Sequence, residues 1–223
     1  MAAKKLAAIF DMDGTMVNNT PYHLRSWQAL FKKYKLGELS AQTYYTEISG
    51  VPIIETLKGL FPDADESRLN KLLKEKEDLY KELYGPYVAP VNGLENFLSE
   101  LKDADVKLAM ASSATVDDIN FILSHVPVRE YFEVIIDGNR VSKPKPNPQI
   151  FLKAAADLGI EPADCVVFED SLAGIKAANA AGMKVVGVTT SHPPEKLQPS
   201  NLTVTDFTEL DPQKLEALFE KDK

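Results

Sequence analysis

From about residue 92 onward, short apolar runs alternate with amphipathic helical patterns, and this alternation constrains the fold more than any other feature of the chain. The apolar residues of 94–102, for example, fall at the i, i+3, i+4 and i+7 positions of a helix. The expected strands are 6–10, 106–111, 134–136, 165–168 and 184–188, and the expected helices are 94–102, 150–158 and 172–181. Strands that alternate with helices form right-handed βαβ units. The sequence therefore predicts an α/β fold built on a parallel sheet.

Residues 17–88 have a different pattern, with helical periods, many charges and no convincing strand. Gly85-Pro86 and Ala89-Pro90 interrupt the chain before the alternation begins. We predict a helical domain over 17–88, inserted between the first strand and the rest of a core formed by 1–16 and 89–223. Such a domain, hinged over the carboxyl edge of the sheet, would cover a site there and exclude water. A helical subdomain that only adds stability fits the pattern as well.

The first apolar run ends in two carboxylates, Asp11 and Asp13, followed by Gly14. Ligands of open α/β sheets bind beyond the carboxyl ends of the strands, so two acids there invite a metal ion and a phosphate. A calcium loop also begins Asp-x-Asp, but it needs glycine at its sixth position and an acid at its twelfth. Those positions hold Met16 and Tyr22 here, which excludes a calcium loop. A plain acidic turn fits this segment about as well as a catalytic site.

Three further polar segments follow expected strands. A helix N-cap explains Ser112-Ser113 about as well as phosphate binding does, and capping also explains the acids after the fourth strand. The prolines of the loop 142–148 make that loop rigid, although a loop lysine such as Lys143 is usually just solvated. The three segments are Ser112-Ser113, Glu169-Asp170-Ser171 and the loop 142–148, which contains Lys143.

Composition excludes several classes of function. The net charge of −8 and pI near 5.0 disfavour nucleic-acid and membrane partners, which need excess Lys and Arg. The single cysteine, Cys165, lies in an apolar run and reads as a buried, inert thiol. No apolar run reaches membrane-spanning length, and the N-terminal one is too short for a signal-peptide core. We expect a cytoplasmic, monomeric protein whose partner is a small molecule.

Taken together and in this order, the motifs resemble the haloacid dehalogenase superfamily of phosphotransferases. Within it they are most similar to the β-phosphoglucomutase-like branch, which carries a helical cap after the first strand. The resemblance implies a Rossmann-like parallel sheet core with helices on both faces and a small helical cap domain. The motifs that carry it are 10–15 (Phe-Asp-Met-Asp-Gly-Thr), Lys143-Pro144, 169–183 and, at the start of the cap, 22–27.

The resemblance also implies roles for the residues that match. Asp11 is the nucleophile that accepts the phosphoryl group, and Asp13 protonates the leaving oxygen and then activates water. Magnesium is the implied cofactor. The metal ligands would be the Asp11 carboxylate, the Asp13 carbonyl and Asp170, with Glu169 in or just behind the shell. The residues implied to hold the phosphoryl group are Ser112, Ser113 and Lys143.

The resemblance is weaker in the cap. Mutases of this branch bind a second phosphate through an arginine shortly after a Gly-Val pair, but the stretch from Gly50 to Glu55 contains none. Lys76 aligns roughly with another cap cation that binds substrate, although a solvated helix lysine is the better reading. His23 either faces the cleft, where it binds substrate and links cap closure to Asp13, or packs near Trp27.

We therefore predict a magnesium-dependent phosphatase that hydrolyses a small phosphorylated metabolite, such as a sugar phosphate, through an aspartyl phosphate. The acid at position 13 argues for C–O–P or P–O–P chemistry, because dehalogenases lack an acid there and phosphonate cleavers carry a small residue. The alternatives are a β-phosphoglucomutase, an inorganic pyrophosphatase and a catalytically silent binding protein on the same fold.

Overall fold

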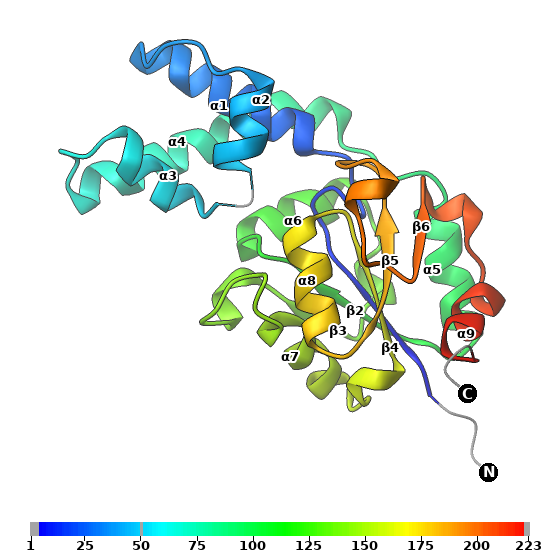
Figure 1. Cartoon of the computed structure of the whole chain (residues 1–223). Helices are drawn as coiled ribbons and strands as arrows, with labels where there is room; N and C mark the ends of the chain where they lie inside the picture. Colours follow the sequence, from blue (N-terminus) through cyan, green and yellow to red (C-terminus); the bar gives the residue numbers. More distant parts are fainter. Residues whose placement is uncertain (1–4, 50, 221–223) are drawn as a thin grey trace. The chain divides into compact units, whose positions relative to one another are not determined.

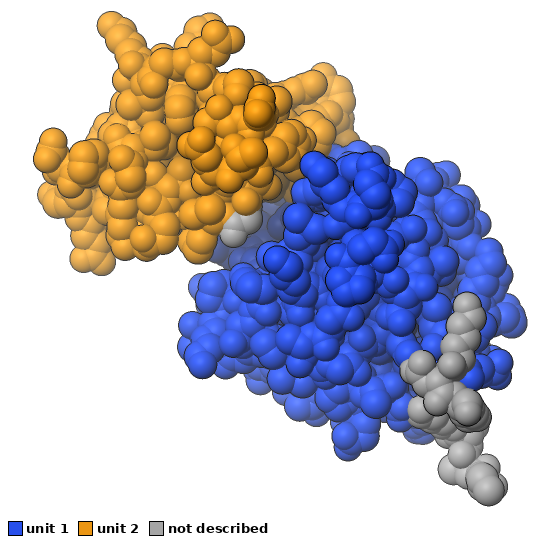
Figure 2. Space-filling model, in the orientation of Figure 1, with its two compact units in different colours: residues 1–18, 89–223 blue, residues 19–88 orange. Residues whose placement is uncertain are grey.

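A computed structural model describes residues 5–49 and 51–220 of the chain. By its contacts the chain divides into two compact units, which Figure 2 shows in different colours. We call 1–18 with 89–223 the sheet unit and 19–88 the helical unit. The first boundary lies two residues later than the one predicted after residue 16. The reason is that Val17 pairs with both Asp13 and Pro90 in β-bridges and so belongs to the sheet unit.

Within the described residues, the sheet unit contains a six-stranded sheet in the order β3-β2-β1-β4-β5-β6, and every neighbouring pair is parallel. This is the doubly wound order, in which the chain crosses from one half of the sheet to the other after β3. The predicted parallel α/β fold is confirmed, and β6 is an addition. The strands are β1 (Ala7–Phe10), β2 (Lys107–Ala111), β3 (Val134–Ile136), β4 (Cys165–Glu169), β5 (Lys184–Val188) and β6 (Leu202–Val204).

Helices cover both faces of this sheet, as Figure 1 shows, with α7 and α8 on one face and α5 on the other. Alternate residues of a strand point to opposite faces, which explains the two layers. Ile9 and Val167 pack with the Ala-rich faces of α7 and α8. The helices are α5 (Leu94–Asp103), α6 (Val116–His125), α7 (Gln149–Leu158), α8 (Leu172–Ala180) and α9 (Pro212–Glu220).

The opposite face of the sheet carries an aromatic cluster. The rings of Phe10 and Phe168, from neighbouring strands, stack with centroids 4.4 Å apart. Phe97 of α5 meets both rings edge-on. Aromatic pairs in these geometries stabilise beyond their buried area. This packing fixes β1 and β4 just before the polar residues that follow them.

The helical unit packs around a core of its own. Trp27, Leu30 and Phe31 form the buried stripe of α1 and share a hydrophobic core with Leu69 and Leu72 of α4. Asp65 caps α4, because its carboxylate accepts the Arg68 backbone N–H at 2.7 Å. The elements are α1 (Thr20–Tyr34), α2 (Ala41–Thr43), the π-helix η1 (Tyr44–Ile48), α3 (Ile53–Leu60) and α4 (Glu66–Tyr84).

Short 3-10 turns complete the chain at η2 (Gly85–Tyr87), η3 (Arg129–Tyr131), η4 (Gly138–Arg140), η5 (Pro162–Asp164), η6 (Pro194–Lys196) and η7 (Phe207–Glu209). Across residues 5–49 and 51–220, no helix has both the length and the apolar character needed to span a bilayer.

Candidate active site

Three neighbouring strands of the sheet unit bring polar residues to the same edge. Asp11 follows β1, Ser112 follows β2, and Glu169 ends β4. The hydrogen bonds between the strands continue into Asp11 and Ser112. The Asp11 N–H donates to the Phe168 carbonyl and the Ser112 N–H to the Ile136 carbonyl, each at 3.0 Å. The sheet thus holds the backbone of the site rigidly. β1, from which Asp11 extends, lies between the other two strands.

A cluster of acids forms at this edge. Asp11, Glu169 and Asp170 each place an oxygen within 4.8 Å of the others, and all three residues are buried. Asp13 is half-buried in the turn that follows Asp11. That turn is closed by hydrogen bonds from the Met16 N–H to the Met12 carbonyl and from the Gly14 N–H to the Val17 carbonyl. The structure therefore brings together three of the four predicted metal-binding residues.

Lys145 supplies positive charge to this cluster. Its Nζ donates to Asp11 Oδ1 at 2.5 Å and to Glu169 Oε2 at 2.7 Å, and its side chain is only 9% exposed. The ammonium also lies 4.9 Å from the ring centroid of Phe151 on α7. Burial acts to lower the pKa of Lys145, but the charges of Asp11 and Glu169 outweigh it and raise that pKa. Lys145 is therefore held as a cation between two carboxylates.

This contact corrects the prediction of Lys143 as the lysine of the site. Lys143 is exposed, and its backbone N–H donates to the side-chain oxygen of Gln149 at 2.9 Å. A turn, closed by the Asn147 N–H on the Pro144 carbonyl, begins just after it and carries Lys145 to the acids. Two Lys-Pro pairs stand in succession here, so a Lys-Pro signature alone does not distinguish them.

The electrostatics of the cluster suit a divalent cation. Burial first, and then the neighbouring Glu169 carboxylate, raise the pKa of Asp11 well above its ordinary value, against the opposing effect of Lys145. The same two causes raise the pKa of Asp170 to about 8. Three buried carboxylates around one ammonium repel one another, and oxygen ligands of this kind are those that Mg²⁺ prefers. The residues present therefore fit a magnesium ion.

Glu169 has both oxygens engaged. Oε2 accepts from Lys145, while Oε1 accepts the backbone N–H groups of Asp170 and Ser171 at 3.1 and 2.9 Å. Capping of the following helix comes from Ser171, whose hydroxyl accepts the Gly174 N–H. Ser171, and neither of the two acids, therefore caps α8, and the acids join the cluster.

Glycines allow the acids to approach so closely. Gly14 has φ of +79°, and a Cβ built on it would lie 2.0 Å from Asp170 Oδ2. A Cβ on Gly174 would lie 1.9 Å from Glu169 Oε2. Any side chain at either position would displace a carboxylate. Thr15 adds a hydroxyl that donates to Asp170 Oδ1 at 3.3 Å. The sequence motifs contain these three residues without indicating these contacts.

Ser112 is buried at the edge, whereas Ser113 is exposed. Neither residue caps α6, because Thr115 does so by accepting the Asp118 N–H at 3.2 Å. The helix-cap alternative for the two serines is therefore wrong. The Ser112 hydroxyl instead accepts the Ala114 N–H at 3.0 Å and remains able to donate its proton.

His23 and Lys76 lie together within the helical unit. The His23 ring stacks on Tyr80, with centroids 4.1 Å apart, and its Nδ1 lies 3.0 Å from Lys76 Nζ. Burial, and then the charge of Lys76, lower the pKa of His23 well below its usual value, so the imidazole is neutral and accepts at Nδ1. Lys76 is only 2% exposed and lies near the rings of Trp27 and Tyr80. The reading of Lys76 as a solvated helix lysine is therefore wrong.

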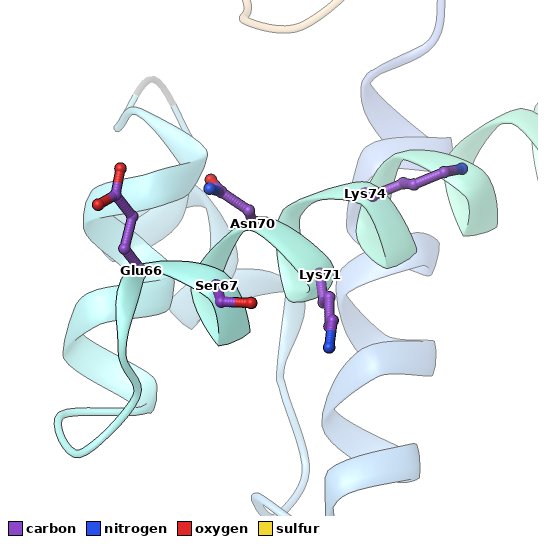
Figure 3. A pocket seen from close by; sticks show the side chains of 5 residues that line it. All are labelled: Glu66, Ser67, Asn70, Lys71 and Lys74. Atoms are coloured by element: carbon purple, nitrogen blue, oxygen red, sulfur yellow. The ribbon is translucent and has the colours of Figure 1, made fainter.

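The helical unit also has a surface hollow, shown in Figure 3. Its side chains are exposed and come from a single helix, α4, and Lys74 among them is paired with Asp78. Such a surface lacks the buried, convergent polar groups of a small-molecule site. The lining residues are Glu66, Ser67, Asn70, Lys71 and Lys74. The stretch from Gly50 to Glu55, which lacks the arginine of the mutases, also belongs to this unit. Gly50 itself lies outside the described residues.

The site thus consists of three buried acids and a buried lysine at the carboxyl edge of a doubly wound parallel sheet. A family model described as haloacid dehalogenase-like hydrolase matches residues 8–188, so the chain belongs to this family. The β-phosphoglucomutase-like branch is also confirmed, by relatives of that name among the sequences and the solved structures.

The sequence relatives include phosphatases and a mutase. The chain is 29% identical to validoxylamine A 7'-phosphate phosphatase from Streptomyces hygroscopicus subsp. limoneus, over 91% of this chain and 94% of the relative. It is 31% identical to β-phosphoglucomutase of Bacillus subtilis, over 84% of each chain. It is 30% identical to the phosphorylated carbohydrates phosphatase of Thermotoga maritima, over 83% of this chain and 86% of the relative.

Among solved structures, a family IA, variant 3 hydrolase of this superfamily from Entamoeba histolytica matches with a TM-score of 0.88 and 26% identity. The match covers 96% of this chain and 99% of that one. The predicted fold is thereby confirmed. The predicted class of enzyme, a phosphoric monoester hydrolase of the haloacid dehalogenase type, is confirmed by the family and by the phosphatases among the relatives.

Proposed function

We propose that the protein is a magnesium-dependent phosphatase that hydrolyses a small phosphorylated metabolite, in particular a sugar phosphate. The observation that carries the proposal is the buried cluster of Asp11, Glu169 and Asp170 around Lys145 at the carboxyl edge of the sheet. Phosphoryl transfer depends mainly on alignment and charge stabilisation, and this cluster supplies fixed charges of both signs. Phosphatases of phosphorylated carbohydrates and of validoxylamine A 7'-phosphate among the relatives support the substrate class.

In the proposed reaction, a carboxylate oxygen of Asp11 attacks phosphorus and forms an O–P bond while the bond from phosphorus to the leaving oxygen breaks. Asp13 gives a proton to that leaving oxygen. Asp13 then takes a proton from water, whose oxygen attacks phosphorus and releases phosphate, so that the Asp11 carboxylate is restored. Ser112 is proposed to donate a hydrogen bond to the phosphoryl oxygens, with Ser113 beside it. Because Lys145 already neutralises Asp11, it also lowers the repulsion between that carboxylate and an anionic phosphate.

Asp11, Asp170 and the backbone carbonyl of Asp13 are the proposed magnesium ligands, with Glu169 behind them and engaged by Lys145. When bound, the ion would offset the negative charge of the acids and of the transferring phosphoryl group. His23 and Lys76 stay predicted substrate-binding residues. The burial of Lys76 and its partly buried contact with His23 support a role beyond solvation.

A β-phosphoglucomutase remains the second candidate, because a relative of that name is 31% identical. A mutase must bind the second phosphate of its bisphosphate intermediate, and arginine is the side chain suited to do so in a bidentate manner. The stretch 50–55 has Pro52 and Ile53 where such an arginine would stand. Without that contact, water should take the phosphoryl group more often than a sugar does.

A screen of phosphorylated metabolites tests the proposal, with released phosphate and isomerised sugar phosphate measured separately. We expect phosphate release that requires Mg²⁺ and little isomer, even with a sugar bisphosphate as primer. Asp11→Asn, purified in the same way, is the control for contaminating phosphatase. More isomer than phosphate would instead establish a mutase. Lack of turnover with every substrate, a generic aryl phosphate included, would favour the silent binding protein.

A further inference from the structure

The loop after β5 reaches the same edge of the sheet and contacts two segments of the acid cluster. Thr190 donates its hydroxyl hydrogen to the Gly14 carbonyl. Two residues later, Nδ1 of His192 lies 3.1 Å from the Asp170 backbone carbonyl. A carbonyl oxygen only accepts, so Nδ1 is the donor. Between them, Ser191 makes a side-chain hydrogen bond to Asp170 that acts to lower the pKa of its carboxyl.

These contacts converge on one junction. The Gly14 backbone lies against the Asp170 carboxylate so tightly that a Cβ would come within 2.0 Å of it. Thr190 holds the Gly14 side of this junction, while His192 holds the Asp170 side. The loop itself is anchored to the sheet, since the Thr189 N–H donates to the Val204 carbonyl at 2.9 Å. The loop therefore bridges the two segments.

We propose that Thr190 and His192 are positioning residues that set the affinity of the cluster for its divalent cation by fixing Asp170 against the Gly14 turn. This inference rests on the metal site of the proposed function. Neither side chain needs to touch the ion. Groups that orient metal ligands through hydrogen bonds commonly change metal affinity by about 10-fold to 100-fold when they are removed.

Titration calorimetry with Mg²⁺, and with Mn²⁺ where the heats are small, measures the affinity directly on the whole protein. Thr190→Val keeps the shape of the side chain and removes the donor, so we expect the dissociation constant to rise by about 10-fold. Thr190→Ser keeps the hydroxyl, so its dissociation constant should be close to that of the wild type. His192→Ala should weaken binding similarly, whereas His192→Asn, whose amide can donate in place of Nδ1, should recover part of the affinity.

Two matched controls are available in the sheet unit. Thr203→Val makes the same change on β6, and His125→Ala removes an Nδ1 that lies 2.9 Å from another backbone carbonyl, that of Phe121 on α6. Both controls should bind metal like the wild type, and metal-free melting curves should show all variants folded. A purely structural role for the loop would lower the melting temperature without changing the dissociation constant of the folded protein.

The outcomes separate this inference from the proposed function. If the wild type binds Mg²⁺, Asp170→Asn abolishes binding, and Thr190→Val and His192→Ala both bind like the controls, the positioning role is overturned while the metal site stands. If the wild type does not bind a divalent cation, or Asp170→Asn binds it normally, both the positioning role and the proposed metal site are overturned.

Discussion

Replacement of Lys145 by methionine tests the most specific feature of the site. The side chain is 9% exposed and makes two charged contacts, at 2.5 and 2.7 Å, with Asp11 and Glu169. Methionine keeps much of the length and the contact with Phe151 but removes the charge. The acids would then stay buried without the ammonium, and removing one partner of a buried ion pair costs about 3–5 kcal/mol.

The effect on catalysis follows from the same contacts. Loss of one preorganised donor to a developing charge lowers kcat by about 10²-fold to 10³-fold, and we expect at least this for Lys145→Met. The assay is steady-state phosphate release at saturating Mg²⁺, together with urea unfolding of the metal-free protein. Because Mg²⁺ can replace part of the missing positive charge, it should recover more stability in the variant than in the wild type.

Lys143→Met is the matched control, since the same substitution falls two residues away on an exposed side chain. We expect its activity to stay within about twofold of the wild type, as is usual for surface positions. The reasoning is refuted if Lys143→Met loses activity while Lys145→Met retains it. It is also refuted if Lys145→Met leaves both activity and stability unchanged.

Two further perturbations address the metal site. Gly14→Ala should abolish metal-dependent activity, because the added Cβ would displace Asp170. Gly159→Ala is the control: its φ is +70° and the space around an added Cβ is open, so it should lose stability but keep activity. Equal activities of the two variants would contradict the proposed crowding at Gly14. In the metal-free protein, burial and then Glu169 raise the pKa of Asp170 from 3.8 to about 8. The folded state therefore binds this proton more tightly, so its contribution to stability is full below about pH 4 and is lost as the pH rises through about 8. Melting temperatures should thus fall over this range, less so with Mg²⁺ bound, and a rise in the metal-free protein would contradict the assignment.

The sequence predicted the parallel sheet because short apolar runs alternate with helical patterns, which is the order of βαβ units. It did not predict β6, whose three residues Leu202–Val204 are too few for a periodic signal. The helix between β2 and β3 was not located either. Its start is set by the cap at Thr115, while the apolar residues of α6 also resemble a strand.

Within the site, the acids were predictable because they directly follow strands. The correct lysine was not, because two identical Lys-Pro pairs differ only in their position relative to a turn. The buried state of Lys76 depends on rings from α1 and α4, which sequence spacing alone does not bring together. The contacts of Thr190 and His192 end on backbone carbonyls, which every residue carries, so no residue type in the sequence marks them.

The most direct test of the account is whether a phosphoryl group is transferred to Asp11. Asp13→Asn, mixed with an aryl phosphate and Mg²⁺, should form the aspartyl phosphate, because this leaving group departs without protonation, and hydrolyse it slowly for want of the base. After acid quenching and trypsin digestion, tandem mass spectrometry should find one added phosphoryl group on Asp11 within peptide 6–25, and none in the variant Asp11→Asn. A phosphoryl group on another residue, or its complete absence during turnover of the substrate, would contradict Asp11 as the nucleophile.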